Sequence, residues 1–138
     1  ATHGLVNESE PALSKILLQP GQGEDGSLYT GELYNLSIPA DLVTLSACET
    51  GLGKIAKGEG IVGLSRALQY AGARNIIVSL WQVADASTAE MMINFYAYNL
   101  NNQSYGYNAA LRQAKLKLLE SDEYNRPYFW APFILVGF

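Results

Sequence analysis

Cysteine and histidine are almost absent from this sequence. The 138 residues contain one cysteine, Cys48, and one histidine, His3. A single cysteine cannot form a disulfide within the chain, which fits a reducing compartment and predicts a cytoplasmic protein. One cysteine and one histidine also cannot supply by themselves the several ligands that a metal site needs.

Charge is scarce as well. Charged residues make up 16% of the chain, and the formal net charge is −4. The nine basic residues are scattered, which argues against nucleic acid as a partner because phosphate binding needs clustered Lys and Arg. A small basic group at Arg112, Lys115 and Lys117 is typical of the solvated face of a helix.

Long hydrophobic runs are missing too. No apolar stretch reaches the roughly 20 residues that span a bilayer, and no signal peptide opens the sequence, so no membrane partner is expected. Hydrophobic residues nevertheless make up 49% of the chain, enough for a folded domain. At this length we expect one domain.

The apolar pattern predicts alternating strands and helices. Since strands that alternate with helices pair in parallel through right-handed crossovers, we expect an α/β sandwich. Gly72 suits the left-handed position after a helix, and Ser87 to Glu90 has the spacing of a capping box. Residues 5–12 are expected to form a polar loop, and Thr30 to cap a short helix. The expected strands are 13–18, 27–29, 42–48, 75–80 and 133–136, and the expected helices are 31–36, 60–70, 87–100 and 107–119.

The stretch from Leu42 to Gly53 carries the cysteine. An apolar, β-branched run of strand length ends at Cys48 and continues into a glycine-rich turn that leads to a helix. Such a strand end presents a nucleophile in open α/β sheets, and the positive end of the next helix favours a thiolate. A lone cysteine closing an apolar run is also typical of an inert core residue, so the pattern alone leaves both interpretations open.

A cysteine nucleophile needs a base and donors for the oxyanion. His3 is the one imidazole in the chain, and it precedes Gly4, whose backbone can approach a ligand closely. The N–H groups of Gly4 and Cys48 are candidate donors to the oxygen of a bound carbonyl. Cys48 and His3 therefore form a possible catalytic dyad.

Six blocks in order carry a resemblance to a known family. They closely resemble the CHAT domain, a family of caspase-like cysteine peptidase domains often fused to tetratricopeptide repeats. The blocks are Ala1–Gly4, Leu45–Gly51, Gly58–Ala67, Ala71–Ala73, Ser79–Val83 and Tyr128–Gly137.

The resemblance implies a caspase–haemoglobinase-like three-layer sandwich with a mostly parallel sheet. It implies that His3 is the base, that Cys48 is the nucleophile, and that Gly4 and Cys48 supply the oxyanion hole. Residues 1–138 then form the C-terminal portion of a single CHAT domain that lacks its N-terminal strands, including most of the strand before His3. We therefore expect little or no peptidase activity from this chain alone, and activity in its parent protein.

By the same resemblance, Ser79 and Trp81 line the primary substrate pocket, and Asp85 pairs with a basic substrate residue. Asp85 has an equally good structural interpretation as a charge in the first turn of the helix over 87–100. Trp130 is expected in the core with Phe133 and Leu135. The tyrosines at 96, 98, 105 and 107 are expected to serve packing or a partner surface.

The sequence thus predicts a cysteine endopeptidase that cleaves protein or peptide substrates through an acyl-enzyme. It is expected to act without a metal or organic cofactor, within a larger signalling or regulatory protein that carries an upstream repeat domain. The alternative is a catalytically silent interaction or scaffold module of the same fold.

Overall fold

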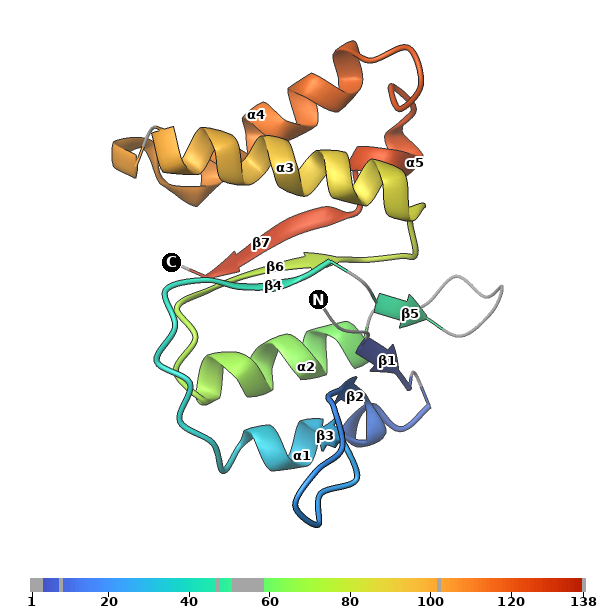
Figure 1. Ribbon diagram of the computed structural model, residues 1–138, viewed down its shortest axis with the longest axis vertical. Coiled ribbons are helices and arrows are strands. Elements are labelled where there is room, and N and C mark those ends of the chain that lie inside the picture. Colours follow the sequence, from blue (N-terminus) through green and yellow to red (C-terminus); the bar gives the residue numbers. More distant parts are fainter. Residues whose placement is uncertain (1–3, 8, 47, 51–58, 102, 138) are drawn as a thin grey trace. The chain divides into compact units, whose positions relative to one another are not determined.

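The computed structural model describes residues 4–7, 9–46, 48–50, 59–101 and 103–137. The chain divides into two compact units, one formed by Ala1–Gln82 and Val136–Phe138 and the other by Val83–Leu135. The described residues form a mixed α/β structure with two small sheets and five α-helices (Figure 1). No helix among them is long and apolar enough to cross a membrane.

The first sheet has the order β3-β2-β1-β5. β2 (Lys15–Leu17) and β3 (Ser27–Tyr29), which lie within the predicted strands 13–18 and 27–29, form an antiparallel hairpin. β1 (Gly4–Val6) pairs antiparallel with β2 and parallel with β5 (Cys48–Thr50). Since β1 lies partly within the expected loop 5–12, that prediction is wrong for Leu5 and Val6. The strand has three residues, too few for a period-two pattern to be recognised.

The second sheet has the order β4-β6-β7. β4 (Val43–Leu45) runs parallel to β6 (Asn75–Ser79), with Val43 opposite Ile76 and Leu45 opposite Val78. β7 (Phe133–Gly137) is the third strand. The predicted strands at 75–80 and 133–136 are confirmed.

The single strand predicted over 42–48 is wrong. Its residues form β4 in one sheet and the start of β5 in the other, so Cys48 begins a strand instead of ending one. Apolar periodicity identifies extended backbone but carries no signal for the sheet that each part joins. A mostly parallel sheet is not confirmed, because the described pairings include two antiparallel ones, β1–β2 and β2–β3, beside the parallel pairs β1–β5 and β4–β6.

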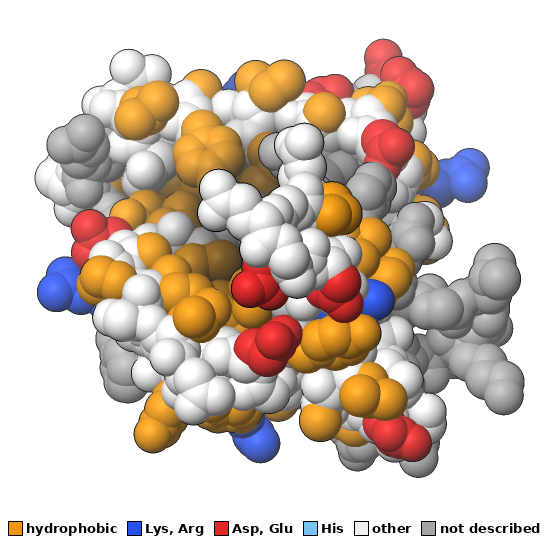
Figure 2. Space-filling view, turned by 60° about the horizontal axis from the view of Figure 1, so that its bottom comes forward, with side chains coloured by type: hydrophobic (Ala, Val, Ile, Leu, Met, Phe, Trp, Pro, Cys, Tyr) orange, Lys and Arg blue, Asp and Glu red, His pale blue; other side chains and the backbone are white. Residues whose placement is uncertain are grey.

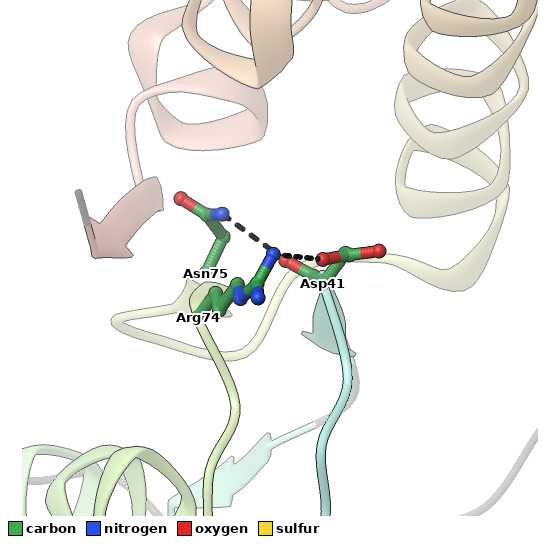
Figure 3. Close-up of polar contacts among 3 residues, drawn as sticks. All are labelled: Asp41, Arg74 and Asn75. Carbon is green, nitrogen blue, oxygen red and sulfur yellow. Dashed lines mark hydrogen bonds and ion pairs between the residues drawn. The ribbon is translucent and has the colours of Figure 1, made fainter.

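A polar cluster joins the amino ends of β4 and β6 (Figure 3). Arg74 Nη1 lies 3.0 Å from Asp41 Oδ1, and Asn75 Nδ2 donates to the Asp41 carbonyl at 3.1 Å. The Arg74 backbone N–H donates to the Ala40 carbonyl at 2.9 Å. The ion pair is largely exposed and adds little stability, but the backbone contacts fix the register in which the two strands start.

The helices of the first unit are a short 3-10 helix at Pro11–Leu13, α1 (Thr30–Leu33) and α2 (Glu59–Tyr70). α2 ends at Tyr70, and Gly72 has the predicted left-handed conformation just beyond it, with a φ of +113°. The N–H of Ala73 donates to the Leu68 carbonyl and that of Gly72 to the Gln69 carbonyl, both at 3.0 Å, which is the Schellman arrangement. Thr30 does not cap α1, because it lies inside the helix and its hydroxyl donates to the Ser14 carbonyl.

The second unit contains α3 (Asp85–Asn101), α4 (Gly106–Glu120) and α5 (Pro127–Trp130), with a short 3-10 helix at Gln103–Tyr105. On α4 the buried face consists of Ala110, Leu111, Ala114 and Leu118. Ser87 is not an N-cap, because it lies inside α3, is buried, and donates its hydroxyl to the Ala84 carbonyl at 2.9 Å. The buried side chains of α3 and α4 include Met91, Phe95, Ala110, Leu111, Ala114 and Leu118.

Hydrophobic side chains also reach the surface. Figure 2 shows them beside acidic side chains in the middle of the face that comes forward from the bottom of Figure 1. In the first unit, Tyr34 and Tyr70 pack ring against ring with centroids 5.3 Å apart, although Tyr70 is 74% exposed. Scattered apolar exposure of this kind is normal for a folded protein.

Candidate functional site

Gly4 and Cys48 lie opposite each other on neighbouring strands. In the parallel ladder of β1 and β5, Gly4 pairs with Cys48, Leu5 with Glu49 and Val6 with Thr50 (Figure 1). Two segments that are far apart in the sequence, and that hold the predicted oxyanion donors, are therefore adjacent. Gly4 is buried.

β1 is held on its other side by β2, with Gly4 opposite Ile16 and Leu5 opposite Lys15. Beyond β1, the N–H of Asn7 donates to the hydroxyl of Ser14 at 3.0 Å. The Ser14 carbonyl in turn accepts hydrogen bonds from the Thr30 N–H at 2.8 Å and the Thr30 hydroxyl at 2.9 Å. Ser14 is fully buried, so it links β1, β2 and α1 from the interior.

The turn after β1 closes through Asn7. Its Oδ1 accepts hydrogen bonds from the backbone N–H of Ser9 at 3.1 Å and of Glu10 at 2.8 Å. Asparagine favours such turns because its side chain reaches the backbone two and three residues further on. This turn sends the chain back toward β2 and ends β1 at Val6.

Two of the predicted site features fall outside the described residues. These are His3 and the side chain of Cys48; the backbone of Cys48 is described as the first residue of β5. What the structure brings together is the backbone of Gly4 and of Cys48. No sequence pattern identifies the pairing partner of Gly4, although its neighbours Leu5 and Val6 have the apolar character of a strand.

The predicted substrate residues have other contacts. Ser79 ends β6, is 1% exposed, and donates its hydroxyl to the Trp81 carbonyl at 2.6 Å. That bond fixes the turn after β6 and occupies the hydroxyl. Trp81 is half-buried, and Asp85 is exposed as the first residue of α3, where a negative charge complements the helix dipole.

Trp130 is not a core residue as predicted. It is half-buried, and its Nε1–H donates to the Asn125 carbonyl at 3.0 Å. Its ring lines a surface groove with residues of α4, whereas Phe133 is fully buried as expected. Indole is often placed in this way, with an apolar ring packed and its N–H bonded.

The basic group on α4 is also less uniform than predicted. Lys117 is exposed and forms an ion pair with Glu120 at 3.2 Å. Lys115 is half-buried in the same groove as Trp130, and this burial lowers its pKa below the usual 10.5. The spacing of the basic residues gave no sign of this difference.

The tyrosines divide between packing and exposure. Phe95 contacts the ring of Tyr96 with centroids 5.0 Å apart and that of Tyr107 at 6.4 Å, while Tyr105 is 67% exposed. Within the described stretches, no group of three or more His, Cys, Asp or Glu side chains is placed to hold a metal ion.

Comparisons with known proteins identify the family. A family model described as the CHAT domain matches residues 1–138. Tetratricopeptide repeat protein 28 from Homo sapiens is 32% identical over 110 residues, and the protein of the same name from Mus musculus is also 32% identical over 110 residues. Each alignment covers 80% of this chain and 4% of the relative, so the chain spans only a small part of those proteins.

Proposed function

This chain belongs to the CHAT domain family, and we propose that it is a cysteine endopeptidase domain of a larger protein. The Cys48 thiolate attacks the scissile carbonyl of a protein substrate, and His3 protonates the leaving amine. Water then hydrolyses the acyl-enzyme with His3 as base. The N–H groups of Gly4 and Cys48 receive the oxyanion.

The register of β1 against β5 carries this proposal, since Gly4 pairs with Cys48. Paired strands lie about 4.8 Å apart, so the backbones of the two proposed oxyanion donors, Gly4 and Cys48, are direct neighbours.

We further propose that the two sheets are parts of a caspase-like sandwich.

For substrate recognition we propose that Trp81 contributes a pocket wall and Asp85 pairs with a basic side chain of the substrate. Ser79 supports the pocket through its bond to the Trp81 carbonyl. Asp85→Asn should lower kcat/KM for peptides with Arg at the cleaved position about tenfold and leave peptides with a neutral residue there within about twofold. Equal losses for both peptides would assign Asp85 to helix stability alone.

The upstream repeat domain is also a proposal. The two relatives are named for tetratricopeptide repeats and are far longer than this chain. A repeat array is a natural carrier for substrate selection, because its concave surface binds extended segments.

The decisive experiment measures the reactivity of the Cys48 thiol in the complete gene product. The rate of carboxamidomethylation by iodoacetamide is followed against pH by mass spectrometry of the peptide that contains Cys48. A reference peptide with the same flanking residues gives the behaviour of a free thiol, whose pKa is about 8.5. At pH 6 we expect Cys48 to react about tenfold faster than the reference.

Two variants make the result specific. His3→Ala should return the rate and its pH dependence to those of the reference, and Cys48→Ala should abolish peptide cleavage. A Cys48 that reacts no faster than the reference, in a protein whose cellular effect survives Cys48→Ser, supports the scaffold module instead of the peptidase.

A further inference from the structure

The second unit has a groove formed by α4 and α5 alone, with a volume of about 360 Å³. Its apolar lining comes from three leucines and one indole, and two basic side chains border it. The leucines are Leu111, Leu116 and Leu119, the indole is Trp130, and the basic residues are Arg112 and Lys115.

The groove is elongated along α4. Its lining starts at Asn108 and ends at Leu119, which is 47% exposed. Eleven steps along a helix rise about 16 Å, or three turns. A compact ligand fills a rounder pocket, whereas a second helix presents one apolar side chain per turn along such a stripe.

The secondary structure of the groove walls indicates which class of molecule can bind there. Both walls are helices, so the lining of the groove offers no strand edge for an extended peptide. Ridges of side chains on one helix fit between those of another. The occupant that suits the groove is therefore helical.

The two basic residues indicate the charge of the helix that binds in the groove. The ion pairs between described side chains are Asp41–Arg74 and Lys117–Glu120, so Arg112 and Lys115 have no acidic partner in that part of the chain. Lys115 is half-buried, and burial disfavours its ammonium form. A carboxylate of the bound partner next to Arg112 and Lys115 would stabilise the ammonium form of Lys115.

We propose that the groove binds an amphipathic α-helix of a protein partner whose apolar side chains are flanked by Asp or Glu. The apolar side chains lie on Leu111, Leu116, Leu119 and Trp130, and the acidic ones pair with Arg112 and Lys115. This binding site uses none of the residues assigned to peptide cleavage and does not depend on that activity.

The test uses a fluorescein-labelled helical peptide of about 16 residues, with leucine at every third or fourth position and glutamate beside the leucines. Its binding to the 138-residue chain is followed by fluorescence anisotropy at about 50 and 300 mM salt. We expect binding at micromolar concentration that weakens with salt. Arg112→Glu and Lys115→Glu should each weaken it about tenfold.

Lys117→Glu is the matched control, because it makes the same charge change on the same helix outside the groove lining. It should alter binding by less than about twofold. A peptide with every glutamate replaced by lysine should bind only the double variant Arg112→Glu, Lys115→Glu. Circular dichroism of each variant checks that α4 is intact.

Three results would overturn the proposal. The first is equal binding of the acidic and basic peptides, and the second is equal weakening by Lys117→Glu. The third is occupation of the groove by another class of molecule: displacement of the peptide by a small fatty anion such as decanoate at lower concentration, or self-association of the chain that Leu119→Glu abolishes.

Discussion

The hydroxyl of Ser14 lies where water does not reach, and it accepts the hydrogen bond of the Asn7 N–H just beyond β1. Replacing it with alanine leaves that N–H without its partner. We expect Ser14→Ala to lower the free energy of unfolding by about 1–2 kcal/mol, measured by urea denaturation. The control is Ser9→Ala, because the Ser9 hydroxyl is exposed and donates to the same Asn7 side chain. Its effect should stay below about 0.5 kcal/mol; equal losses for both variants would deny Ser14 this role.

Lys115 gives a pH-dependent prediction. Burial lowers its pKa in the folded chain below 10.5, so the charged lysine opposes folding at neutral pH. That opposition fades as pH rises through the lowered pKa and is gone above the unfolded value. Lys115→Met should therefore raise the free energy of unfolding at pH 7, with a difference from wild type that narrows toward pH 10.5.

The matched control for this series is Lys117→Met, which removes an exposed lysine paired with Glu120. Thermal unfolding of the three proteins across the pH range provides the measurement. A Lys115→Met difference that stays constant with pH would mean that lost packing, and not charge, causes the effect.

For some single residues, the sequence pattern does not predict the role of the side chain. The composition around Trp130 is that of a core segment, yet its ring lines a groove because α5 has four residues and ends at the surface of its unit. The Ser79 hydroxyl donates a hydrogen bond to the Trp81 carbonyl two residues further on. No sequence motif predicts this contact. Side-chain roles depend on the packing of neighbouring elements, which a pattern in one segment does not encode.

At the scale of elements, the end of α2 depends on one glycine. Gly72 has a φ of +113°, and a Cβ there lies 3.2 Å from the Ile38 carbonyl oxygen. Gly72→Ala should destabilise the chain by about 1–2 kcal/mol.

Gly63 in the interior of α2 is the opposite case. A Cβ there meets Pro11 Cβ at 3.5 Å, an ordinary contact, so Gly63→Ala should stabilise the chain by up to about 1 kcal/mol through higher helix propensity. Urea denaturation of Gly72→Ala and Gly63→Ala measures both changes in the free energy of unfolding. Effects of the same sign would contradict the assignment of Gly72 to the left-handed helix end.

The longer elements were the ones that the sequence predicted well. The helices over 60–70 and 107–119 are observed as α2 and α4 within one residue at each end, because their apolar spacing extends over several turns. The helix predicted from Ser87 starts two residues earlier, at Asp85, since the serine hydroxyl bonds back to Ala84 instead of capping. β1, with three residues, was missed.

At the scale of the whole molecule, the second unit is an insertion in the first, which the chain leaves at Gln82 and re-enters at Val136. Compact units often open separately. In native-state hydrogen exchange we expect the amides of α3 and α4 to share one opening free energy that differs from that of β6. One common value for all three elements would indicate a single cooperative unit.

The ordered blocks of the sequence predicted the family, and this prediction is confirmed over residues 1–138. They did not predict the division of Leu42 to Thr50 between two sheets. That division depends on pairings with residues far along the chain: β4 pairs with β6, and β5 pairs with β1. Such partners are set by the whole fold, and a local apolar run is equally compatible with either.

The pairing of Gly4 with Cys48 also has a consequence for the order of folding. The hairpin of β2 and β3 and its pairing with β1 join segments close in sequence, whereas β5 comes from roughly 40 residues beyond β1, so its docking carries a larger loop-closure entropy. We expect pulse-labelled exchange to detect β1–β3 protection before that of β5. The proposed catalytic pair then assembles only once the long-range contacts are made, so under the proposed function partly folded chains should not cleave their neighbours.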